Sequence, residues 1–381
     1  MTLTYRCPRC GNTDVRYIGY LNGLPYCRKC ILFYGEKVEE KKREGGLVSL
    51  KLNYSLSEEQ ERISNQLLEN YKNNIDSLVN AVCGAGKTEI VFRVISYALS
   101  RGLTVGFAIP RRDVVIELYV RLKNVFNANS VVAVYGGSTS RLSADIVVLT
   151  THQLYRYDKY FDLLILDEID AFPFKGNDLL YKMFDNSVRG NSVLMSATPS
   201  EEVLQTYTHP GKAILELNTR FHKHPLPVPQ LISILPLLKD AFLIKKMKQF
   251  LKENKPILIF TPTIYECENL YNRIRRIVPG GYYVHSKLLK RSEIIKKFRS
   301  NRYKYLFTTA VLERGVTIRN LQIIVYNADN TLYDEHALVQ IAGRAGRKSD
   351  APTGEVIFIA TKISESMEKA RRTIESKNKF L

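Results

Sequence analysis

The sequence contains no long apolar segment, no low-complexity tract and few cysteines. No apolar run approaches the ~18 residues that a membrane-spanning helix needs. Residues 1–10 lack the basic-then-apolar layout of a secretory signal. The six cysteines among 381 residues are not spaced as a disulfide framework. We therefore expect a cytoplasmic protein, for which any membrane association would come through a partner.

Acidic residues are also scarce, because 38 Asp and Glu face 56 Lys and Arg, a net charge of +18. The excess is uneven: residues 212–381 carry 31 basic and 15 acidic side chains, and it is densest from Lys287 to Lys304. Such a balance favours a polyanionic partner, usually nucleic acid. The hydrophobic fraction of 45 % and the length indicate a globular chain of two or three domains.

Short apolar runs alternate with amphipathic stretches over most of the chain. This pattern predicts an α/β fold in which parallel sheets are covered by helices. The predicted segments are a cysteine module at 1–47, a first domain at 48–210, a proline-containing linker at 211–230 and a second domain at 231–381. The predicted strands are 77–82, 104–109, 131–135, 145–150, 163–166, 192–196, 257–260, 281–284, 305–308, 322–326 and 355–359, and the clearest predicted helices are 90–100, 114–126 and 365–377.

A glycine-rich stretch follows the first of these strands and opens a helix. Its core is Gly84, Ala85, Gly86, Lys87 and Thr88. Glycines let backbone N–H groups surround phosphates, and a helix N-terminus adds partial positive charge. Lys87 could reach the β- and γ-phosphates of ATP, and the Thr88 hydroxyl could hold Mg²⁺. Ala81 stands where the strict pattern has glycine, but the core in this setting still predicts a nucleotide site.

A second candidate site lies where an apolar strand ends in carboxylates, Asp167, Glu168 and Asp170. Ligands gather at the C-terminal ends of parallel strands. Asp167 would accept from Mg²⁺-bound water, and Glu168 would polarise the attacking water. The next strand is followed by Ser196 and Thr198, small hydroxyl residues that could couple this acidic site to the rest of the protein.

Two arginines three residues apart, Arg344 and Arg347, stand among small residues far downstream. We expect them on one helix face. An arginine at the γ-phosphate stabilises transition-state charge by ~10³–10⁵ in rate in known cases. The stretch from Thr308 to Val316, with Thr309, Arg314 and Gly315, suits a loop that touches both nucleotide and nucleic acid.

Taken together, these motifs resemble superfamily-two helicases of the DEAD-like group over nearly the whole chain. The resemblance implies two tandem RecA-like domains with ATP between them, and it gives Gln60 the family's adenine-reading role. It implies backbone contacts to nucleic acid at eight residues: Arg111, Arg112, Gly137, Thr151, His152, Thr261, Thr309 and Arg314. The motif Asp-Glu-Ile-Asp differs from Asp-Glu-Ala-Asp and weakens the case for a DEAD-box RNA helicase.

A narrower resemblance is to the ComFA family, the motors for DNA import in natural transformation of Gram-positive bacteria. The residues that carry it are the four-Cys module, 81–88, 167–174, 220–229 and 312–317. It implies an ATPase stimulated by single-stranded DNA that works with ComFC and DprA beside the ComEC channel. The alternatives are a PriA-like replication-restart or repair helicase, an RNA helicase, and a non-motor DNA-binding scaffold.

Two C-x₂-C pairs, Cys7 with Cys10 and Cys27 with Cys30, are separated by 16 residues. This is close to the spacing of a zinc ribbon, in which four thiolates leave no open coordination position. We expect a structural Zn²⁺ site, since so short a domain needs such a staple. Basic and tyrosine side chains in the module could bind DNA, or the module could dock a protein. Both alternatives stay open.

Overall fold

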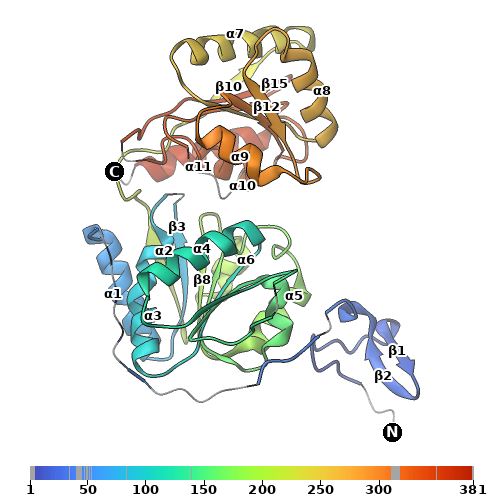
Figure 1. The fold of residues 1–381 in the computed structure, drawn as a ribbon, viewed down its shortest axis with the longest axis vertical. Helices are drawn as coiled ribbons and strands as arrows, with labels where there is room; N and C mark the ends of the chain where they lie inside the picture. The colour runs from blue at the N-terminus through green and yellow to red at the C-terminus, as the bar shows by residue number, and fades with distance from the viewer. Residues whose placement is uncertain are drawn as a thin grey trace. The chain divides into compact units, whose positions relative to one another are not determined.

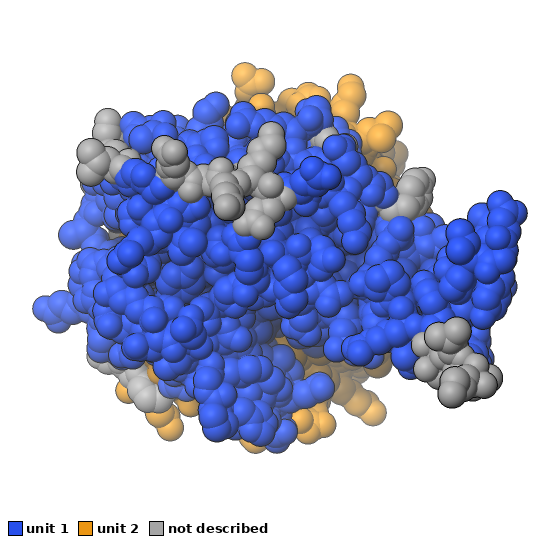
Figure 2. Space-filling view, turned by 90° about the horizontal axis from the view of Figure 1, so that it is seen from below, with its two compact units in different colours: residues 1–81, 86–217 blue, residues 82–85, 218–381 orange. Residues whose placement is uncertain are grey.

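The structure, a computed structural model, describes residues 5–33, 35–39, 45–46, 48, 50, 52, 54–82, 84–138, 140–309, 318–348 and 350–379. They form two compact units, coloured separately in Figure 2. The first comprises residues 1–81 and 86–217, and the second comprises residues 82–85 and 218–381. No helix in these ranges is long and apolar enough to cross a membrane.

The first unit is built on a seven-stranded sheet whose paired strands all run parallel, in the order β5-β6-β4-β7-β8-β3-β9. Its strands are β3 Asp76–Ala81, β4 Val105–Ile109, β5 Val131–Val134, β6 Ile146–Thr150, β7 Phe161–Asp167, β8 Val188–Ser196 and β9 Lys212–Leu217. Every residue of β4 and β6 is buried. Continuous burial of this kind is typical of central parallel strands covered on both faces.

Six α-helices accompany this sheet in the described ranges (Figure 1), and they are α1 Glu58–Lys72, α2 Lys87–Ile90, α3 Phe92–Ser100, α4 Arg112–Val125, α5 Asp178–Ser187 and α6 Glu201–Thr206. Helix α1 begins with a capping box, in which Ser57 and Gln60 bond each other's backbone N–H. The predicted helix at 90–100 is divided in the structure: Ile90 ends α2, Val91 is a turn residue, and α3 begins at Phe92.

The linker is shorter than the sequence predicts. Strand β9 pairs with β3 along its whole length, so residues 212–217 belong to the first sheet and not to the linker. At the other end, β10 Gln230–Ser233 pairs with β15 of the second sheet. Edge strands are half-exposed and carry charged residues such as Lys212 and Glu216, so β9 lacks the apolar run by which the central strands were predicted.

The second unit contains a six-stranded parallel sheet in the order β10-β15-β14-β11-β13-β12. Besides β10, its strands are β11 Ile257–Phe260, β12 Gly281–Val284, β13 Tyr305–Thr308, β14 Gln322–Tyr326 and β15 Val356–Ala360. Its helices are η4 Pro236–Leu238, α7 Lys239–Lys252, α8 Ile264–Ile274, α9 Arg291–Arg299, α10 Glu335–Ala342 and α11 Glu365–Asn378. The predicted strands 257–260, 281–284, 305–308 and 322–326 coincide with β11 to β14.

The cysteine module is a small hairpin that belongs to the first unit. It consists of η1 Val15–Tyr17, β1 Ile18–Leu21, β2 Leu24–Cys27 and η2 Arg28–Cys30. Asn22 and Gly23 connect the two strands with positive φ, as a two-residue hairpin turn requires. The module rests on η3 Thr151–Arg156 and on α5: the Asn186 side chain donates to the Arg9 carbonyl at 2.8 Å, and Phe33 stacks on His152.

Candidate active site

The phosphate loop begins where β3 ends. Gly84 and Gly86 both have φ near +80°, a conformation that side chains disfavour, and Gly86 caps the N-terminus of α2. Lys87 and Thr88 are therefore the first two residues of this helix. Cys83 lies outside the described residues. The main chain thus takes the turned path that a phosphate cradle needs.

Gln60 lies directly against the phosphate loop. A Cβ atom added to Gly86 would be 2.3 Å from Gln60 Nε2, so a side chain there would displace the Gln60 amide. The Gln60 side chain is 5 % exposed and accepts from the Ser57 backbone N–H at 2.9 Å through Oε1. The capping box of α1 therefore holds the predicted adenine-reading side chain beside the loop.

Strand β7 brings the acidic residues to the same edge of the sheet. Lys87 Nζ lies 3.7 Å from Asp167 Oδ1, and both side chains are mostly shielded from solvent. Glu168 has φ +61°, an uncommon conformation for a residue with a side chain, and its N–H donates to Asp167 Oδ1 at 2.8 Å. The structure thus places Lys87, Asp167 and Glu168 together, as expected for phosphoryl transfer.

The predicted coupling residues bond the last carboxylate of this motif. Ser196 Oγ donates to Asp170 Oδ1 at 2.8 Å, and Thr198 Oγ1 donates to Asp170 Oδ2 at 3.0 Å. Thr198 N–H also donates to Ser196 Oγ at 3.0 Å. All three side chains lie at the end of neighbouring strands β7 and β8. A movement of the residues after β7 would therefore also move the residues after β8, because these hydrogen bonds connect them.

The donors at this edge suit a magnesium ion. The Asp167 carboxylate ends β7, and Lys87, next to the Thr88 hydroxyl, lies against it. A carboxylate and a hydroxyl are oxygen ligands, the kind that Mg²⁺ prefers, and Mg²⁺ usually completes its shell with waters and substrate phosphates. Asp167 and Thr88 would hold the ion, whose charge offsets that of the phosphates.

In the second unit, two predicted nucleic-acid residues meet at the ends of adjacent strands. Thr261 follows β11, and its N–H donates to the Thr308 carbonyl of β13 at 2.8 Å. The side chains of Thr261 and Thr309 are buried, at 0 % and 9 % exposed. Any contact from Thr261 would therefore be made through its main chain. Arg314 and Gly315, in the predicted loop, lie outside the described residues.

The two downstream arginines are not on a helix, contrary to our expectation. Helix α10 ends at Ala342, and residues 343–346 form a turn. Gly343 caps the helix, and Gly346 has φ +60° with no room for a Cβ, which would lie 2.1 Å from the Pro352 carbonyl. Arg344 is 5 % exposed, whereas Arg347 is half-buried. The glycines that flank the arginines end the helix that their spacing suggested.

The remaining predicted nucleic-acid residues occupy two environments. Arg112 is exposed at the start of α4, where its guanidinium lies 4.7 Å from the Tyr135 ring centroid, and Gly137 is exposed with φ +88°. Arg111 precedes the same helix. Thr151 is fully buried, so its side chain does not face solvent, and His152 stacks on Phe33 at a centroid distance of 6.0 Å.

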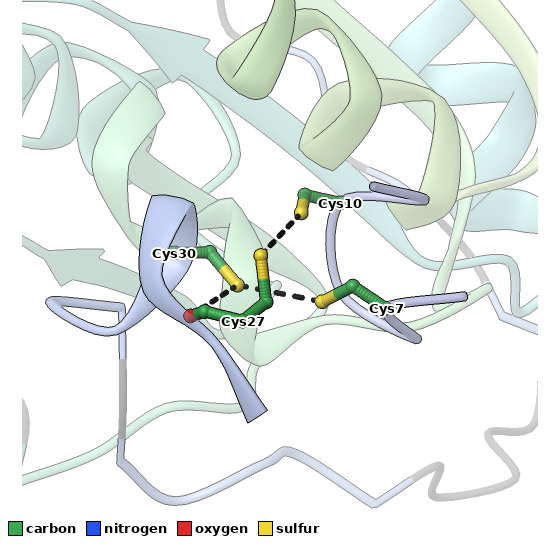
Figure 3. Close-up of side chains that lie close together, drawn as sticks. All are labelled: Cys7, Cys10, Cys27 and Cys30. Carbon is green, nitrogen blue, oxygen red and sulfur yellow. Dashed lines mark hydrogen bonds between the residues drawn. The ribbon is translucent and has the colours of Figure 1, made fainter. Parts of the chain in front are cut away.

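The four N-terminal cysteines converge (Figure 3). Cys7 Sγ lies 3.5 Å from Cys30 Sγ, Cys10 Sγ lies 3.6 Å from Cys27 Sγ, and all four sulfurs are within 4.8 Å of one another. A disulfide needs about 2.05 Å, whereas tetrahedral zinc with bonds of about 2.3 Å places sulfurs about 3.8 Å apart. Burial raises the pKa of Cys10 to about 11, so the thiolate of Cys10 needs a cation nearby. The donor set fits Zn²⁺.

Sequence reasoning missed two arginines, one in each unit, that contact predicted site elements. Arg121 of α4 pairs with Glu89 of α2, and Tyr54 donates to the same carboxylate at 3.4 Å. Tyr54 also lines a cavity beside the first turn of α1. Arg220, in the linker, is 2 % exposed and donates to the turn that carries Arg344. Tyr54, the aromatic residue shortly before Gln60, was a usable signal. Arg220 was marked only as the first residue of the stretch 220–229, with no role of its own.

Comparison with known proteins agrees with this geometry. A DEAD/DEAH box helicase model matches residues 57–206, and a helicase conserved C-terminal domain model matches residues 240–349. Among solved structures, Dbp5 of S. cerevisiae bound to RNA and ADP BeF3 superposes with a TM-score of 0.64 at 17 % identity, covering 86 % of this chain and 93 % of that one. The chain is an ATP-hydrolysing helicase with two RecA-like domains.

Two relatives narrow the class. The competence protein ComFA of Bacillus subtilis is 36 % identical, with 99 % of this chain and 86 % of that protein aligned. The competence protein ComFA of Streptococcus pneumoniae is 33 % identical, with 98 % and 90 % aligned. The chain belongs to the ComFA family. The family and the enzyme class predicted from the motifs are thereby confirmed.

Proposed function

We propose that this helicase moves along single-stranded DNA and drives DNA uptake in natural transformation. The observation that carries the proposal is the match to two competence proteins over nearly the whole chain. The charge distribution supports a polyanionic substrate, because the basic excess lies in residues 212–381.

The residues of the first unit have distinct roles in this proposal. Lys87 binds the β- and γ-phosphates, and Glu168 orients the attacking water. Gln60, held beside Gly86, reads the adenine. Asp170 is hydrogen-bonded to Ser196 and Thr198. Through these bonds, a conformational change on ATP binding or hydrolysis moves the two hydroxyl residues. Arg344 and Arg347 stabilise the charge that develops on the γ-phosphate during transfer.

The proposed strand contacts are mainly to the backbone, so the motor does not depend on sequence. They involve Arg111, Arg112, Gly137 and His152 in the first unit and Thr261 and Thr309 in the second. A structural Zn²⁺ ion on the four cysteines holds the N-terminal module. ComFC, DprA and the ComEC channel are the proposed partners, through which the protein works at the inner face of the membrane.

Comparing polyanions as activators tests the proposed substrate. ATP turnover of the full chain is measured with single-stranded DNA, duplex DNA and RNA of equal length at one fixed salt concentration, since affinity for polyanions falls steeply with salt. We expect single-stranded DNA to stimulate most. Stronger stimulation by RNA or by duplex would contradict the proposal.

A matched pair of variants connects this turnover to the site. Lys87→Ala should lower turnover about 100- to 1000-fold, because one preorganised positive group at the phosphates is lost, while DNA still binds. Lys72→Ala removes an exposed lysine of α1 that pairs with Glu69 and should turn over ATP normally. Normal turnover in Lys87→Ala would refute the assigned phosphate site.

A further inference from the structure

Arg220 is the largest fully buried side chain in the described part of the protein, although it stands in a segment without helix or strand. Its Nη1 donates to the Gly346 carbonyl at 2.7 Å, and its Nη2 donates to the carbonyls of Gly343 and Ala345 at 3.2 and 3.1 Å. A buried guanidinium is costly unless it is hydrogen-bonded. All three of these acceptors belong to one four-residue turn.

These acceptors stand next to the predicted transition-state arginines. The Gly343 carbonyl belongs to the peptide group that precedes Arg344, and the Gly346 carbonyl belongs to the peptide group that precedes Arg347. Fixing these two peptide planes restricts the backbone from which each arginine side chain departs. The N–H groups of the turn already bond the end of α10, from Gly343 to Val339 at 2.9 Å and from Arg344 to Ile341 at 3.1 Å. Arg220 adds hydrogen bonds on the carbonyl side of the same turn.

The segment around Arg220 is itself anchored to the second unit. His222 Nε2 lies 3.1 Å from the same Gly346 carbonyl. Leu226 exchanges two main-chain hydrogen bonds with the side chain of Asn378 at the end of α11, at 2.8 and 2.9 Å. Arg220 thus reaches the turn from a segment that is fastened at a second, independent point.

Only arginine suits this arrangement among the basic residues. A guanidinium is planar and offers several donors in fixed directions, so it can hold three carbonyls of a turn at once. A lysine ammonium keeps the charge but offers its donors from a single atom. The acceptors are backbone carbonyls, so their geometry does not depend on the side chains of the turn.

We propose that Arg220 is a positioning residue for ATP hydrolysis: by holding the carbonyls of Gly343, Ala345 and Gly346, it sets the direction in which Arg344 and Arg347 act. This inference rests on the proposed role of those two arginines. It predicts that weakening the Arg220 contacts slows the chemical step and leaves nucleotide binding in place, because the arginines act on transition-state charge.

The test compares Arg220→Lys with Asn378→Ala. Arg220→Lys should lower kcat about 10- to 100-fold, the effect of misplacing a catalytic group by about 1 Å, with KM for ATP nearly unchanged. Its melting temperature should fall, because buried carbonyls lose donors, so kcat is measured at a temperature at which both variants are fully folded. Asn378→Ala breaks the second fastening of the same segment and should keep full kcat. A rise in KM with unchanged kcat, or an equal loss of kcat in both variants, would overturn the inference.

A double-mutant cycle separates this inference from the proposed function on which it rests. If Arg220 acts through the arginines, Arg220→Lys should lower kcat no further in an Arg347→Ala or Arg344→Ala background. Fully additive losses in both backgrounds would contradict the inference. Normal kcat in both Arg344→Ala and Arg347→Ala would refute the proposed arginine role. Full kcat in Arg220→Lys alongside inactive arginine variants would refute only the positioning role.

Discussion

The cysteine module and the linker are two short segments that pack on a RecA-like unit with hardly any core of their own. In the module, large apolar side chains of the hairpin face solvent, Tyr20 at 70 %, Leu21 at 69 % and Leu24 at 72 % exposed. In the linker, residues 218–229 form no helix or strand. Four thiols organise the first segment, whereas one buried guanidinium organises the second.

The four-cysteine cluster of the module (the metal centre) and Arg220 with the turn carbonyls that it bonds (the linker centre) differ in the ligands that they need. Thiolates need a cation to be stable when buried, so the module depends on a ligand from outside the chain. Arg220 takes its acceptors from the main chain of the same unit and needs nothing else. The first centre can therefore be removed by a chelator, and the second only by mutation.

The largest expected effect comes from removing the metal centre. Cys7→Ser with Cys10→Ser should abolish zinc binding and unfold residues 5–38, since a structural zinc site contributes about 10–16 kcal/mol to folding. The RecA-like part of the first unit should still bind ATP. Metal content and hydrogen exchange of the module measure the two effects.

The matched control is Cys267→Ser, in which a fully buried cysteine of α8 in the second unit is changed. It should keep zinc content and module protection unchanged. Equal zinc content in the double variant and the control would exclude a zinc site at the four cysteines. Loss of ATP binding in the double variant would show that the module is not dispensable for the motor fold.

A smaller effect is expected from separating the module from the motor while keeping its zinc. Phe33→Ala removes the ring that stacks on His152 and meets Tyr155 edge-on at 5.9 Å. Aromatic pairs contribute about 1 kcal/mol beyond burial, so affinity for single-stranded DNA should fall about fivefold if His152 contacts the strand. Fluorescence anisotropy with a labelled oligonucleotide measures this.

Tyr20→Ala serves as the comparison, because Tyr20 is an exposed aromatic residue of β1 in the same module. If Tyr20→Ala weakens DNA binding and Phe33→Ala does not, the module itself grips the strand. The sequence left open whether the module binds DNA or docks a protein, and that result would favour direct DNA binding.

Much of the fold could be predicted because the central strands are buried on both faces. Runs such as Ile257–Phe260 are apolar throughout and bounded by turn residues, and this run became β11 with the predicted bounds. The edge strands β5 and β12 were also predicted, because their runs are apolar or aromatic. The edge strands β9 and β10 were missed, since Lys212–Leu217 mixes charged and apolar residues. Their pairing with β3 and β15 depends on tertiary contacts that no local pattern reveals.

The residues of the candidate site likewise include some that the sequence predicted and some that it did not. Motif residues that follow buried strands, such as Asp167 and Ser196, were predictable because strand ends gather at one edge of a parallel sheet. The turn that carries Arg344 was mistaken for helix, although Gly343 and Gly346 were visible signals. Arg220 begins the stretch 220–229 that carries part of the family resemblance, but the sequence assigns it no role. Its role comes from burial against carbonyls 123 to 126 residues away in sequence, which only the fold shows.

The smallest expected effect tests the linker centre through pH. His222 Nδ1 accepts from the His224 N–H at 3.2 Å, while Nε2 faces the Gly346 carbonyl, an arrangement that requires neutral imidazole. Burial, with the Arg220 charge, lowers the pKa of His222 below its usual 6.5. The unfolded chain therefore binds the proton more readily, so the stabilisation is complete above about pH 6.5 and is lost as the pH falls further.

The variant His222→Gln keeps a donor for the Gly346 carbonyl and cannot titrate. The melting temperature of the natural protein should therefore fall more steeply between pH 7 and pH 5 than that of the variant, by a few degrees at most for one half-exposed group. His209→Gln, at an exposed histidine of the first unit, should retain the natural slope. If the slope is the same in all three proteins, the imidazole is not part of the linker centre, and Arg220 alone holds the turn.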